Sequence, residues 1–171
     1  MVSRYPLCRT FVATLAVTLV ATLVVLTLCF GWVSPAQATS YDRQSLRNTD
    51  WSNQDLRGNN YTSADMADAD MSHSDLRGVR LFDTTLARAN MAGANMSGAT
   101  LDSARFYQAN LTNAILEGAY VFGTDFREAT IDGADFTDVL LDPKVNKMLC
   151  EVATGTNPVT GRSTRDTLYC F

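Results

Sequence analysis

The chain has 171 residues, of which 46% are hydrophobic, and a formal net charge of −4 at pH 7. An acidic chain is a poor general binder of nucleic acid, because phosphate binding needs a surplus of lysine and arginine. The single histidine, His73, has no second histidine beside it as a metal ligand. The composition therefore argues against nucleic-acid binding and gives no sign of a metal ion or another cofactor.

Residues 1–38 are predicted to be a signal peptide for export. Two arginines precede residues 10–33, which carry no charge and are dominated by Val, Leu, Ala and Thr. The tripeptide Ala-Gln-Ala, which ends at Ala38, has the small residues of a signal-peptidase site, so we expect cleavage after Ala38. The alternative is a retained membrane anchor, because an apolar run of about 24 residues is long enough to span a bilayer.

Residues 39–43 are expected to be a linker, and residues 44–142 form an internal repeat. From Leu46 to Leu141 every fifth residue is apolar, and a small residue, most often alanine, lies two positions before it. A period of five excludes a helix, in which steps of five scatter side chains around the cylinder. It also excludes a flat strand, in which odd steps place them on opposite faces. The pattern predicts a chain that turns a corner every five residues and keeps the apolar side chains inside.

The repeat predicts an all-β solenoid with four five-residue faces in each coil, and its length corresponds to about five coils. Seven glycines fall two residues after the apolar centre, at the corner, where φ is expected to be positive. The first coil departs from the pattern, and we expect it to be a capping coil whose interior positions at the end of the stack are solvated. Its positions for small residues hold Gln44, Thr49, Gln54 and Asn59.

The repeat resembles that of the pentapeptide-repeat family, whose consensus is A(D/N)LXX. Clear copies begin at Ala64, Ala69, Ala89, Ala109 and Ala134. The resemblance covers about three fifths of the chain and implies a right-handed quadrilateral β-helix. The motifs of serine hydrolases, nucleotide-binding loops, zinc proteases and dinucleotide-binding folds do not occur in the sequence. We therefore expect no enzymatic activity.

Residues 143–171 are predicted to form a short helical cap at the C-terminal end. Asp142 is suited to cap the helix, and proline at position 143 suits its first turn. Apolar residues then follow at helical spacing and should cover the open backbone edge of the last coil. These residues are Val145, Met148, Leu149 and Val152.

Cys150 and Cys170 are the cysteines that remain after cleavage, and we expect them to form a disulfide that staples the cap. An even number of cysteines in an exported chain favours such a bridge. A reactive redox pair is the alternative, although the C-x-x-C spacing is missing. The tail around these cysteines is similar to that of lumenal pentapeptide-repeat proteins of cyanobacteria and chloroplasts. This similarity implies the thylakoid lumen as the destination, with the periplasm as the alternative.

Several outward positions carry apolar rather than polar side chains, and they form the predicted partner-binding face. With twenty residues per coil, Phe82, Asp102 and Phe122 fall in one column, and Tyr120 and Leu140 fall in the neighbouring column, after Arg80 and Thr100. Tyr107 lies on an adjoining face. Exposed aromatic clusters are typical of binding surfaces. The alternative is that the cap or the tail folds over these side chains.

The sequence thus predicts an exported scaffold or protein-interaction module without enzymatic activity. Its expected partner is an unidentified protein, free or associated with the membrane, and no small-molecule substrate is expected. Some carboxylates, such as those of Asp50 and Asp70, should lie one above the other in successive coils. We interpret them as part of a solvated face rather than as a Ca²⁺ or catalytic site. The alternative function is DNA mimicry that inhibits type II topoisomerase, a role of some pentapeptide-repeat proteins. Mimicry requires a continuous acidic stripe and a cytoplasmic location, whereas arginines interrupt the acidic residues here.

Overall fold

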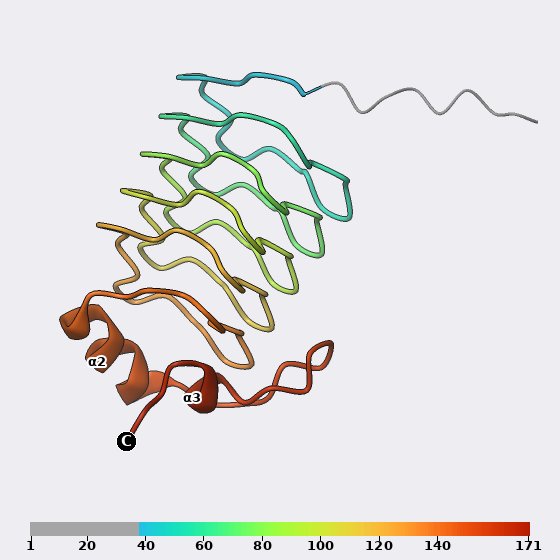
Figure 1. Cartoon of the computed structure of the whole chain (residues 1–171). Helices are drawn as coiled ribbons and strands as arrows, with labels where there is room; N and C mark the ends of the chain where they lie inside the picture. The colour runs from blue at the N-terminus through green and yellow to red at the C-terminus, as the bar shows by residue number, and fades with distance from the viewer. Residues whose placement is uncertain (1–37) are drawn as a thin grey trace, which may run out of the picture. The chain divides into compact units, whose positions relative to one another are not determined.

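The computed structural model describes residues 38–171, so the predicted signal peptide up to position 37, and the alternative of a membrane anchor, lie outside the described residues. The described part contains two helices, α2 (Pro143–Val152) and α3 (Thr164–Thr167). Both lie at the C-terminal end of a stack of coils (Figure 1). In this part of the chain no helix has the length and hydropathy needed to cross a bilayer.

Parallel bridges between residues twenty positions apart hold the stack together. The first joins Ser40 to Asn60 and the last joins Ile115 to Asp135, with one bridge on each five-residue face. A coil therefore has four faces, as the repeat predicts. Pairing begins at Ser40, inside the segment 39–43 that was expected to be a linker.

The apolar centres of the repeat form one continuous core. Every central side chain from Leu56 to Phe136 is buried, and so are the alanines two positions before the centres. The backbone follows the same register: the N–H of Leu81, for example, donates to the carbonyl of Thr100 in the next coil at 2.8 Å. Both the core and the backbone hydrogen bonds therefore link each coil to the next.

The corner of every face holds a residue with a positive φ. From Arg43 to Asp138, each fifth residue has a φ between 54° and 76°, and the seven predicted glycines are among them. For residues other than glycine, this conformation has a free-energy cost of about 1 kcal/mol or more. Asp and Asn side chains before the centre support the turn, as expected: Asp70 Oδ1 accepts the N–H of Ser72 at 2.9 Å.

The end of the first coil is solvated, as its sequence predicts. Gln44 and Gln54 are exposed, and an aromatic cluster fills the interior beside them. Tyr41 stacks on Tyr61 with ring centroids 5.1 Å apart, and Trp51 packs edge-on against both rings. Burial raises the pKa of Tyr61 to about 12, so its hydroxyl stays neutral.

The cap helix α2 begins as predicted. The carboxylate of Asp142 accepts the N–H of Lys144 at 2.8 Å, and a proline occupies the first turn. Leu149 is buried, and Val145 packs partly buried against the core. Val152 was expected on the same face, but this expectation is wrong: the side chain is 56% exposed, because the helix ends at this residue.

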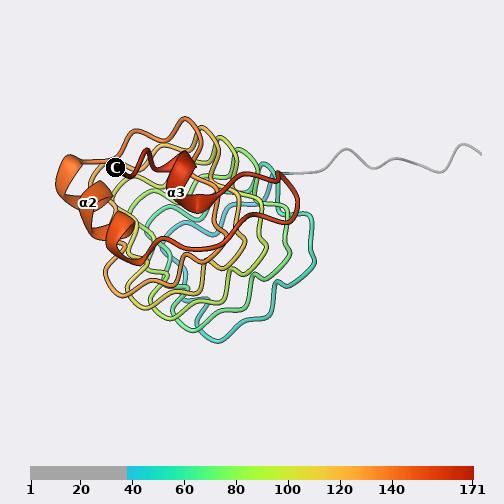
Figure 2. The same cartoon turned by 90° about the horizontal axis from the view of Figure 1, so that it is seen from below.

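The tail after α2 covers the part of the last coil from Asp132 to Phe136. The N–H of Gly133 donates to Thr154 O at 2.9 Å, and the N–H of Phe136 donates to Thr167 Oγ1 at 3.1 Å. The Asn157 amide adds a bond to Gly133 O at 2.9 Å. Seen along the stack, the tail with α3 crosses the outline of the coils, whereas α2 lies at one side (Figure 2).

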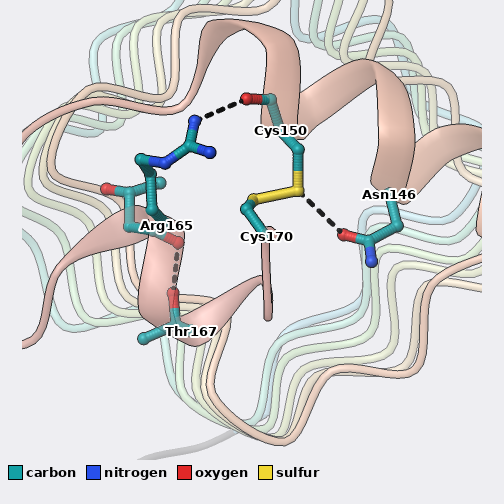
Figure 3. The surroundings of a disulfide bond; sticks show 6 residues. Asn146, Cys150, Arg165, Thr167 and Cys170 are labelled. Atoms are coloured by element: carbon teal, nitrogen blue, oxygen red, sulfur yellow. Dashed lines mark hydrogen bonds between the residues drawn. A yellow bond between two sulfur atoms is a disulfide. The ribbon is translucent and has the colours of Figure 1, made fainter.

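The predicted disulfide between Cys150 and Cys170 joins the end of the tail to α2 (Figure 3). The two Cα atoms lie 5.6 Å apart, across a sequence separation of 20. Arg165 supports the junction, because its Nη1 donates to the carbonyl of Cys150 at 3.0 Å. The helix and the tail therefore form one stapled cap.

Candidate functional site

Three of the side chains predicted to bind a partner lie together at the C-terminal end of the stack of coils. Tyr120, Phe122 and Leu140, hereafter the apolar patch, line one surface cavity of 390 Å³ together with Asp102. Their exposed fractions are 65%, 86% and 91%. The cap and the tail therefore leave the apolar patch open to solvent.

The register of the repeat places the apolar patch on the outside. Tyr120 and Phe122 flank the buried centre Val121, so both side chains face outward. The N–H of Phe122 donates to Asp102 Oδ1 in the preceding coil at 2.7 Å, which fixes the backbone beneath the phenyl ring. Leu140 falls twenty residues after Tyr120, but no bridge joins them, because the chain leaves the coil here to enter α2.

Phe82 and Tyr107 are not part of the apolar patch. Phe82 is 45% exposed and lies two coils before Phe122 in the same column, with the polar Asp102 between them. Tyr107 is partly buried on another face, where the charge of Glu128 is the main cause that raises the pKa of its hydroxyl. The column pattern predicts which residues face outward, but it does not predict which of them share one site.

A larger cavity adjoins the apolar patch, and the sequence analysis missed it. This groove has a volume of 670 Å³ and lies between the last coil and α2. It shares Val121, Phe122 and Leu140 with the smaller cavity. Residues 121–127 form one wall, and the other wall consists of Leu140, Leu141, Asp142, Lys144, Val145 and Met148. The only sequence signal for the groove is the Asp-Pro pair at positions 142 and 143, which ends the repeat.

Ion pairs dominate the outer faces of the earlier coils. Arg57 donates to both carboxylate oxygens of Asp55, at 2.8 and 2.7 Å, and these hydrogen bonds lower the pKa of Asp55 to about 2. The same pair recurs one coil further on, between Arg77 and Asp75. Aspartate charge on this face is therefore largely balanced by arginine. Within residues 38–171, no three His, Cys, Asp or Glu side chains converge as a possible metal site.

Comparison with known proteins finds relatives in the thylakoid lumen. A family model described as pentapeptide repeats matches residues 43–78, 80–118 and 104–142. A crystal structure of a pentapeptide repeat protein from the Arabidopsis thaliana thylakoid lumen is 40% identical, with a TM-score of 0.74 over 75% of this chain and 90% of that chain.

Two curated proteins of Arabidopsis thaliana are similar over a shorter stretch. Thylakoid lumenal 15 kDa protein 1, chloroplastic, is 53% identical over 47 residues, or 28% of this chain. Thylakoid lumenal protein TL20.3, chloroplastic, is 50% identical over 46 residues, or 27% of this chain. The matches span only 21% and 16% of these two relatives.

Proteins built from pentapeptide repeats form right-handed quadrilateral β-helices, and the bridges and corners described above belong to that architecture. The helical cap and its disulfide complete the fold at one end. The number of coils, about five, stays a prediction from the length of the repeat.

Proposed function

The chain belongs to the pentapeptide-repeat family, and from this premise we propose that it is an exported, non-enzymatic module that binds another protein in the thylakoid lumen. The observation that carries the proposal is the apolar patch, in which two aromatic side chains and Leu140 are exposed beside each other. Exposed apolar surface that is contiguous typically marks a site of protein association.

The coil beneath the apolar patch suits this role because it is rigid. The backbone of Tyr120 donates to Ala99 O at 2.9 Å, and that of Phe122 donates to Asp102 at 2.7 Å. The centre between them, Val121, is buried in the core. A preorganised surface loses little conformational entropy when a partner binds, so more of the contact energy contributes to affinity.

Three observations support the lumenal location. The relatives named above are thylakoid lumenal proteins. Residues 1–38 have the pattern of a signal peptide, and the disulfide is of the kind that persists in oxidising compartments. An export to the periplasm is the alternative that the same signals allow. Intact-mass measurement on protein from fractionated cells tests the proposal: a lumenal chain without residues 1–38 supports it, and an unprocessed, reduced chain in the cytosol contradicts it.

The side chains of the described part suit binding better than catalysis. His73 lies at a corner with its ring against Gly93, and both cysteines of the cap are held in the disulfide. DNA mimicry also fits this surface poorly, because arginines pair with the acids that would have to form the stripe, as in the pairs Arg57–Asp55 and Arg88–Asp68.

The test of protein binding is affinity capture from the exported fraction with the wild-type chain and with Phe122→Asp. Phe122 is 86% exposed, so this change places a charge in the apolar patch without disturbing the core. We expect recovery of the partner to fall about tenfold or more, as for a hot-spot residue. Val159→Asp is the matched control, because Val159 is 78% exposed and lines neither cavity. Equal recovery by the two variants would contradict the proposal.

A further inference from the structure

The groove lies over a stretch of backbone whose hydrogen bonds differ from those of the earlier coils. In residues 61–120, the N–H of each central residue and the N–H two residues later donate to carbonyls of the next coil. Leu101 and Ser103 bond in this way to the carbonyls of Tyr120 and Phe122, at 2.7 and 2.8 Å. The two N–H groups of one face thus donate to the two carbonyls on either side of the apolar centre in the next coil.

The equivalent donors of the first half of the last coil have no acceptor among residues 38–171. They are the N–H groups of Val121, Gly123, Phe126 and Glu128. In the second half of the same coil the tail accepts two of the four equivalent N–H groups, those of Gly133 and Phe136. The tail therefore closes only part of the last edge, and the groove borders the half without acceptors.

A row of free N–H groups is complementary to the carbonyl groups of an extended polypeptide. We propose that the groove binds an extended segment of a partner protein, which adds to this edge as the next layer of the stack. The inference rests on the proposed function and specifies how the partner is held. Two partner carbonyls accept the N–H groups of Val121 and Gly123. The apolar residue between these carbonyls packs on Leu141, Val145 and Met148, which line the groove.

The open edge suits one extended segment rather than a second copy of the solenoid. The first coil of another copy also presents backbone carbonyls at its edge, but a whole coil needs all four faces of the last coil. Leu149 of α2 already packs into the core at this end, and the tail occupies the edge at Gly133 and Phe136. The edge along residues 121–128, whose four equivalent N–H groups have no acceptor among residues 38–171, is the longest stretch left for a partner.

The charges around the groove indicate whether the bound segment is charged or neutral. Arg127 pairs with Asp125 at 2.7 Å, and Lys144 and Asp142 both lie on the opposite wall. The positive and negative groups are equal in number, so the groove attracts neither an acidic nor a basic segment strongly. We infer that recognition depends on backbone hydrogen bonds and on an uncharged, apolar side chain at the centre of the segment.

Residue-resolved amide hydrogen exchange tests this inference on the oxidised protein, produced from residues 1–171 and processed by the cell. The probe is a synthetic peptide that copies residues 119–128, because this segment supplies the equivalent carbonyls one coil earlier. Without peptide, the four open amides should exchange about a hundredfold faster than those of Leu101, Ser103, Phe106 and Gln108. With peptide at millimolar concentration, their exchange should slow about tenfold, and a scrambled peptide should have no effect.

A matched pair of variants locates the effect. Lys144 and Lys147 are both exposed on α2, but only Lys144 lines the groove. Lys144→Trp should fill the groove and abolish the protection by the peptide, whereas Lys147→Trp should retain it. Slow exchange of the four amides in the free protein, or no protection by the peptide, would overturn the inference. Protection that rises with protein concentration alone would identify a second copy as the occupant and would also overturn it.

Partner capture separates this inference from the proposed function. If Phe122→Asp loses the partner while Lys144→Trp retains it, the apolar patch binds the partner and the strand-addition mode is wrong. If Phe122→Asp retains the partner, the proposed function itself fails, whatever the exchange experiment shows. Loss of the partner in both variants, but not in Lys147→Trp, supports both proposals.

Discussion

The guanidinium of Arg162 lies 2.7 Å from the carboxylate of Asp135, and this carboxylate is fully buried. Arg162 belongs to the tail and Asp135 to the last coil, so the ion pair fastens the cap to the solenoid. Arg162 also donates to the carboxylate of Glu117 one coil earlier. A single tail residue therefore ties two coils to the cap.

Loss of this ion pair should destabilise the cap. Arg162→Met leaves the buried carboxylate of Asp135 without its charged partner, and we expect the free energy of unfolding to fall by about 2 kcal/mol. Urea unfolding measures this change. Arg43→Met is the control, because the Arg43 side chain is 79% exposed, and its effect should stay within about 0.5 kcal/mol. Equal effects of the two changes would show that the tail is not fastened in this way.

The same carboxylate predicts how stability depends on pH. Burial alone would raise the pKa of Asp135, but hydrogen bonds from Thr137, Thr160 and Arg162 together outweigh burial and lower it below 3.8. The folded state thus binds the proton less tightly than the unfolded state. The contribution to stability is complete above the unfolded pKa and is lost as the pH falls through the folded pKa.

We therefore expect a constant free energy of unfolding between about pH 5 and pH 7 and a decline below about pH 4. Urea unfolding at a series of pH values checks this, and Asp135→Asn should make the decline shallower. A fall in stability between pH 7 and pH 5, or an equally steep acid decline in Asp135→Asn, would contradict the assignment.

Two glycines of the tail allow a matched test of the cap. Gly155 and Gly161 have φ values of 77° and 70°, so alanine is strained at both positions. At Gly155 a Cβ atom would also lie 2.8 Å from the backbone nitrogen of Gly133, whereas at Gly161 nothing lies within 4 Å. Gly161→Ala should cost about 1 kcal/mol and Gly155→Ala about 3 kcal/mol. Similar thermal unfolding of both variants would mean that the tail does not approach the coil so closely.

The disulfide should stabilise the cap more than the coils. Replacement of Cys150 and Cys170 by serine removes a cross-link over a sequence separation of 20, which should lower stability by about 3 kcal/mol. Hydrogen exchange should become faster in α2 and in the tail, while the amides of the earlier coils keep their protection. A uniform loss of protection along the whole chain would show that the cap and the coils unfold as one unit.

Core and surface phenylalanines should respond differently to the same change. Phe106 is fully buried and stacks on Phe126 at 5.3 Å, so Phe106→Ala should cost about 4 kcal/mol. Phe122 is 86% exposed, and Phe122→Ala should change the free energy of unfolding by less than about 0.5 kcal/mol. Thermal unfolding compares the two. A large destabilisation by Phe122→Ala would assign the apolar patch to folding rather than to binding.

The sequence is sufficient to predict the coil because its interior accepts only one pattern. A large apolar residue such as Leu81 and a small one such as Ala89 must recur in step with the corners, so spacing alone predicts burial, register and positive φ. The start of α2 was equally predictable, because Asp142 has a local capping role. These features depend on neighbours within one coil or one helical turn.

The candidate site depends on longer-range geometry. The groove exists because the chain leaves the coil after Leu140 and α2 packs at an angle that periodicity does not contain. Val152 was misassigned for a similar reason, since the end of the helix decides its exposure. Column spacing places Phe82, Asp102 and Phe122 in one column, but of the two phenylalanines only Phe122 lines the smaller cavity with Tyr120 and Leu140. Local pattern thus predicts which side chains face outward, and the path of the cap decides which of them form a site.

Site-specific photo-cross-linking in intact cells tests protein binding by the apolar patch most directly. Photoreactive benzoylphenylalanine replaces Phe122 in one variant and Val159 in the other, and both positions are exposed on the described surface. We expect illumination before lysis to give a defined adduct with another protein from position 122 and none from position 159. No adduct from position 122, or the same adducts from both positions, would contradict a partner-binding role for the apolar patch.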